Sequence, residues 1–63
     1  MSSAELSSLS STLDQVLARV TALADGRTDK GEPDELAVAL YEVERSLQEA
    51  RRRLGRALDV AQA

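Results

Sequence analysis

Arginine is the residue type in this chain with the most binding chemistry to offer. Five arginines fall within residues 45–56, and Arg45, Arg52 and Arg56 share one face of a predicted helix. Guanidinium groups bind phosphate, so one interpretation is an anion, nucleotide or nucleic-acid site. The other is local ion pairing, since Glu49 lies within four residues of Arg45 and Arg52. We favour pairing because no aromatic side chain lies among the arginines and the net charge is −3.

Side chains suited to catalysis or metal binding are scarce. The 63 residues include no histidine and no cysteine, the usual ligands of a structural zinc site. The sequence shows no general base that could activate one of the serines as a nucleophile. Glu42 and Glu44 point to different faces of a predicted helix and so do not form a pair of carboxylates. We therefore expect no enzymatic activity, no cofactor and no metal site.

The single aromatic residue, Tyr41, marks a second candidate contact. It lies one helical turn from Val38 and one turn from Arg45, so the three form a small amphipathic patch. Tyrosine and arginine are favoured at protein interfaces. The alternative is a tyrosine that lies along the helix with its hydroxyl in water.

Two apolar series, each stepping by alternating threes and fours, must position these residues. This spacing keeps one apolar seam on one side of an α-helix. The first series is Leu6, Leu9, Leu13, Val16, Val20 and Leu23, and the second is Leu36, Leu40, Val43, Leu47, Ala50, Leu54 and Ala57.

A polar segment separates the two series and predicts the helix boundaries. We expect a first helix over about 3–25, capped by Ser2 and ended by Gly26. A loop follows over 26–32. We expect the second helix over about 33–60, because proline suits the first helical turn. The chain is then one all-α domain, an antiparallel two-helix hairpin over 1–63.

The size of the chain favours assembly with a partner. A single core below about 70–80 residues supplies only about 3–5 kcal/mol, and there is no disulfide to add to it. Four further apolar residues widen the stripe beside the seam, which suits a bundle: Leu17, Ala24, Ala37 and Leu58. We expect two hairpins to dimerise through the seam into a four-helix bundle.

These features predict a small, non-catalytic interaction or adaptor protein that self-associates. Binding of an anion or nucleic acid through the arginine face, or a place as accessory subunit of a larger complex, remain alternatives. We expect neither a signal peptide nor a membrane span, because residues 1–5 are not basic and no apolar run approaches membrane length; cysteine is absent as well. We expect a cytoplasmic protein, and the bias toward arginine and alanine suggests a bacterial source.

Overall fold

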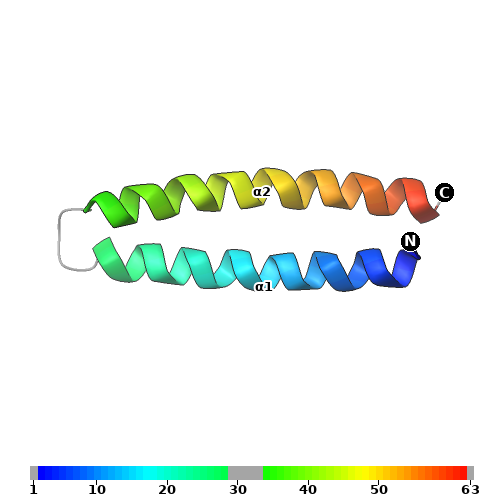
Figure 1. The fold of residues 1–63 in the computed structure, drawn as a ribbon, viewed down its shortest axis with the longest axis horizontal. Coiled ribbons are helices and arrows are strands. Elements are labelled where there is room, and N and C mark those ends of the chain that lie inside the picture. Colours follow the sequence, from blue (N-terminus) through cyan, green and yellow to red (C-terminus); the bar gives the residue numbers. More distant parts are fainter. Residues whose placement is uncertain (1, 29–33, 63) are drawn as a thin grey trace.

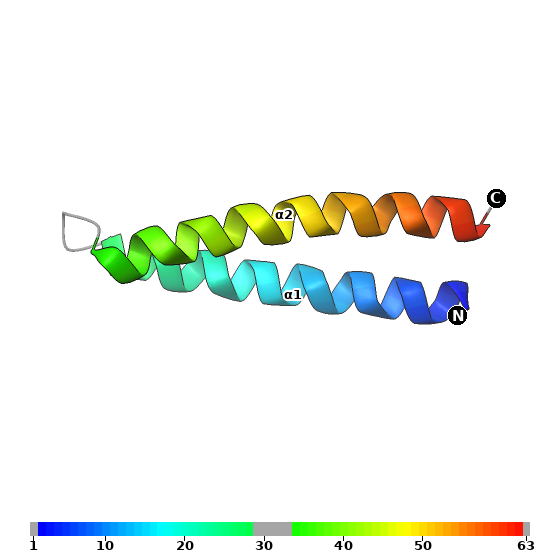
Figure 2. The ribbon, with the colours of Figure 1, turned by 45° about the horizontal axis from the view of Figure 1, so that its top comes forward.

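Two long helices joined at one end make up the described part of the chain (Figure 1). A computed structural model describes residues 2–28 and 34–62. Helix α1 spans Ser3–Thr28 and helix α2 spans Glu35–Gln62. They lie side by side in opposite directions, with both termini at one end, and Figure 2 shows that they cross at a shallow angle. The predicted all-α helical hairpin is confirmed.

Each helix begins at a polar side chain that accepts a hydrogen bond from the first turn. The Ser2 hydroxyl accepts from the backbone N–H of Glu5 at 3.2 Å, as the sequence predicts. The Asp34 carboxylate accepts from the N–H of Ala37 at 2.8 Å and thus caps α2. Helix α2 therefore starts at Glu35, and the predicted role of Pro33 lies outside the described residues.

Helix α1 extends three residues beyond its predicted end. Gly26 was expected to stop the helix, but α1 continues through it to Thr28. A glycine weakens a helix without breaking it, and it ends one only when it adopts a left-handed conformation, which Gly26 does not do. Helix α2 likewise ends two residues later than predicted, at Gln62.

The contact between the helices is rotated from the predicted seam. The three most buried apolar residues are Leu17, Ala24 and Ala37, which the sequence places beside the seam. Ala24 and Ala37 are fully buried, and such small side chains let two helices approach closely near the loop end. Only half of the predicted seam lies next to this buried row, and these residues are half-buried: Leu6, Leu13, Val20, Leu40, Leu47 and Leu54.

Polar contacts across the helices mark the register and accompany this rotation. Arg51 forms an ion pair with Asp14 at 2.7 Å. Thr21 donates a hydrogen bond to the Glu44 carboxylate at 2.5 Å. A step of seven residues forward along α1 thus matches a step of seven back along α2. Both contacts lie where the rows carrying Glu44 and Arg51 turn toward α1, which agrees with the rotation away from the predicted seam.

The hairpin is long and thin, so it buries little. It measures 47 × 15 × 12 Å, and its radius of gyration is 14.5 Å. A compact chain of this length would have a radius of gyration of roughly 11 Å. The accessible surface is 4855 Å², whereas a compact monomer of 6.8 kDa would expose about 4,000 Å². The excess is close to the area of about 800 Å² that each partner buries in a standard interface.

Candidate interaction surface

Most of the large apolar side chains that the hairpin leaves exposed form two rows at heptad spacing. On α1, Leu9, Val16 and Leu23 are 49%, 43% and 63% exposed. On α2, Leu36 and Val43 are about half exposed. Ala50 and Ala57 continue this row and are exposed as well. All seven belong to the predicted seam, and we call them together the open face.

The two rows of the open face lie on the same side of the hairpin. At 100° per residue, Val16 is about 150° around α1 from the side chains of Asp14 and Thr21. On α2, Val43 is about 100° around the helix from Glu44, on the side turned away from the polar contacts. Both rows therefore face away from the side on which Asp14, Thr21 and Glu44 link the helices. One side of the hairpin is apolar along most of its length.

The opposite side, which we call the polar face, is closed by side-chain contacts. The Asp14–Arg51 ion pair and the Thr21–Glu44 hydrogen bond lie there. Nearer the loop, the Tyr41 hydroxyl donates to the Asp25 carboxylate at 3.1 Å. The two sides of the hairpin thus differ, and among the described residues the open face has the longest row of exposed leucines and valines.

The predicted Val38–Tyr41–Arg45 patch is partly engaged within the hairpin. Val38 is half exposed, and Tyr41 is 36% exposed. The hydroxyl of Tyr41 bonds to Asp25 instead of pointing into water. The patch therefore contributes to the contact between the helices, and a partner would find mainly Val38 and the exposed Arg45 there.

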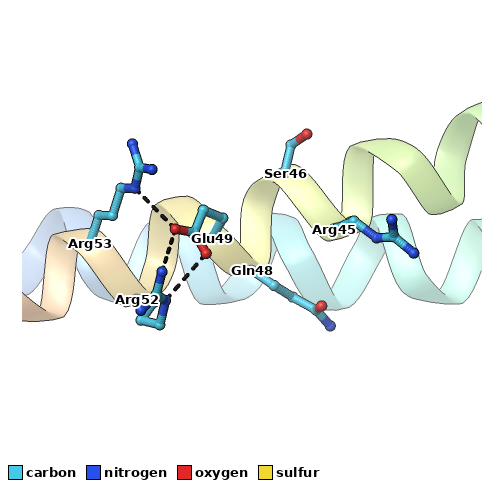
Figure 3. A pocket seen from close by; sticks show the side chains of 6 residues that line it. All are labelled: Arg45, Ser46, Gln48, Glu49, Arg52 and Arg53. Carbon is cyan, nitrogen blue, oxygen red and sulfur yellow. Dashed lines mark hydrogen bonds and ion pairs between the residues drawn. The ribbon is translucent and has the colours of Figure 1, made fainter.

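Two of the arginines of α2 contact the carboxylate of Glu49. Arg52 donates two hydrogen bonds to Glu49, at 3.2 and 2.5 Å, and Arg53 donates one at 3.1 Å (Figure 3). The hydrogen bonds from Arg52, and then the one from Arg53, lower the pKa of Glu49, and the hydrogen bonds to Glu49 raise the pKa of Arg52. The local pairing that the sequence favours is present for these two arginines.

The remaining members of the predicted arginine face do not converge on one point. Arg45 points away from Glu49, as Figure 3 shows. It lines a shallow surface hollow whose other lining residues are Ser46, Gln48, Glu49, Arg52 and Arg53. Arg56 is exposed one turn beyond Arg52. Arg52 is already paired with the carboxylate of Glu49, so this surface carries both positive and negative charges. An anion that binds Arg52 would have to compete with this carboxylate.

The described residues add two observations about other kinds of site. Within residues 2–28 and 34–62, no group of three or more acidic, histidine or cysteine side chains is placed to hold a metal ion. In the same residues, neither helix has a stretch that is both apolar enough and long enough to span a membrane.

Comparison with known proteins gave no relative. No protein-family model, curated protein or solved structure matched this chain.

The sequence places the residues of the open face in one assembly seam with the half-buried residues, and the heptad spacing alone does not separate the two sets. The signal that separates the two roles is the charge of the neighbouring rows. Asp14 on α1 and Arg51 on α2 have opposite charges and each lies next to a row of small or apolar residues. Their pairing predicts which rows turn inward and which rows remain outside.

Proposed function

We propose that the protein is a non-catalytic interaction module whose hairpin self-associates through the open face into a four-helix bundle. The observation that carries this proposal is the row of half-exposed Leu, Val and Ala side chains along one side of both helices. Surface of this kind marks a site of interaction when it is contiguous. Its heptad spacing suits packing against further helices.

A second copy of the chain is the occupant that best fits the size of this surface. The hairpin exposes roughly 850 Å² more than a compact monomer of its mass, and a stable dimer buries about 800 Å² per partner. Among the residues that the structure describes, only Leu17, Ala24 and Ala37 are buried in the single hairpin. Stacking two open faces would bury seven more apolar residues from each copy and give the chain a core.

Sedimentation across a dilution series tests the proposal. We expect a species of twice the 6.8 kDa chain mass at micromolar concentration, with loss of helicity as the dimer dissociates. A fully helical monomer at that concentration would refute the reasoning about core size.

A photo-crosslinking residue at Val16 in the native cell distinguishes self-association from a larger complex. We expect an adduct between two copies of the chain, and none from the same residue placed at Gln15, which points away from α2. An adduct of Val16 with a different protein would instead favour an accessory subunit. Absence of any adduct would count against an interaction module.

A further inference from the structure

The side chains of the open face are larger on α1 than on α2. Seven residues forward on α1 match seven residues back on α2. Each of the three α1 residues of the open face therefore lies at the same height along the hairpin as one α2 residue of the open face. At each of these three levels the larger side chain belongs to α1. The level pairs are Leu9 with Ala57, Val16 with Ala50, and Leu23 with Val43.

Two symmetric stackings bring two open faces together, and both leave every helix antiparallel to its neighbours. With the two-fold axis parallel to the helices, α1 of one copy lies over α2 of the other, and both loop ends are at the same end of the bundle. With the axis perpendicular to the helices, α1 lies over α1 and α2 over α2, and the loop ends are at opposite ends.

The perpendicular arrangement fits the side chains poorly. If its centre lies at the middle of the helices, Val16 meets Val16 of the second copy and Ala50 meets Ala50. Large side chains then hold the two α1 helices apart, while the alanines between the two α2 helices fall short of contact. Helix axes pack about 8–10 Å apart depending on these side chains, and voids in a core are destabilising.

We propose that the two copies stack with the two-fold axis parallel to the helices, so that all four termini lie at one end. This inference rests on the dimer proposed above and specifies its geometry. Each facing pair then joins one larger and one smaller side chain: Val16 faces Ala50 of the other copy, and Leu9 faces Ala57. Alternation of large and small residues across facing positions lets the layers interdigitate at native density.

Distances between spin labels at single introduced cysteines test this geometry, since the chain has no cysteine of its own. Glu35 lies at the loop end, fifteen residues from Ala50, and is exposed. Glu35→Cys is expected to give a separation of about 20–30 Å between copies in the parallel-axis dimer, and of at least about 45 Å in the perpendicular one. Gln48→Cys, near the middle of α2, is the matched control and gives a short separation in both.

The outcomes separate this inference from the dimer itself. Short separations at both positions support the parallel axis. A short separation at 48 with a long one at 35 refutes the parallel axis and leaves the dimer standing. No coupling between copies at either position refutes the dimer and this inference together.

Disulfide crosslinking gives a second measurement that does not depend on labels. We expect Val16→Cys mixed with Ala50→Cys to form a disulfide between the two chains on oxidation, because these positions face each other across the interface. Disulfides require Cα atoms about 4.4–6.8 Å apart, so each variant alone should crosslink poorly. Efficient crosslinking of Ala50→Cys by itself would overturn the proposed axis.

Discussion

Val16→Asp is the substitution that best isolates the open face from the contact inside the hairpin. Val16 lies at the middle of the open face and is 43% exposed, so its replacement can keep the carboxylate in water as long as the hairpin is monomeric. In the dimer the same carboxylate would be buried without a partner. The matched control is Gln15→Asp, which adds the same charge one residue away on the outer side of α1.

The expected effect on dimerisation is large. Full burial of a valine is worth about 1.5–3 kcal/mol, so covering the remaining 43% contributes about 0.6–1.3 kcal/mol in each copy. Burial of an unpaired carboxylate costs several kcal/mol more for each ion. Over the two copies we expect a loss of at least about 5 kcal/mol, which weakens the dimer by more than a thousandfold.

Sedimentation equilibrium of the two variants, with circular dichroism at the same concentrations, measures this effect. We expect Val16→Asp to be monomeric at micromolar concentration and Gln15→Asp to remain dimeric. A Val16→Asp protein that dimerises as tightly as Gln15→Asp would show that the open face does not form the interface.

Leu13→Asp or Leu47→Asp should abolish helicity and assembly together, because both leucines lie between the buried row and the open face; circular dichroism and sedimentation measure this. Gly55→Ala should raise the free energy of unfolding by about 0.5–1 kcal/mol in thermal or urea denaturation, since the added methyl group meets no atom within 4 Å. The lowered pKa of Glu49 means that its contribution to stability is present above the ordinary value of 4.5 and is lost as the pH falls through the lowered value. Glu49→Gln should therefore be slightly less stable than the parent at pH 7, and the difference should vanish in acid. In mobility-shift assays at low salt we expect no binding of RNA or DNA, because Glu49 already pairs with Arg52; a salt-dependent shift would revive the arginine surface as a binding site.

Heptad spacing was sufficient to predict the number of helices and the hairpin, because each apolar series continues for six or more positions without a break. The cap at Ser2 was also predictable, since a serine three residues before a glutamate is a local signal. The end of α1 was not, because a glycine permits a left-handed conformation without requiring one.

Rotation of the helices about their axes was harder to predict, because each apolar stripe is three rows wide. Any two adjacent rows of such a stripe can face the partner helix, and the spacing of leucines does not choose between them. The choice depends on contacts between residues far apart in sequence, such as Asp14 with Arg51, and on how closely Ala24 allows α2 to approach. The close approach at Ala24 and Ala37, together with the polar pairs beside it, thus distinguishes the leucines that the hairpin covers from those that it leaves exposed.

The polar face has a consequence for how assembly stops. A hairpin with apolar rows on both sides would present a fresh docking surface after every addition, and copies would stack into an open-ended fibre. Here the Asp14–Arg51 and Thr21–Glu44 contacts occupy the side opposite the open face. When two open faces meet, the side that each copy turns outward carries these ion-pair and hydrogen-bond contacts instead of a second row of exposed leucines and valines. In the proposed dimer, closure at two copies would thus follow from the same pairs that mark the register of the hairpin.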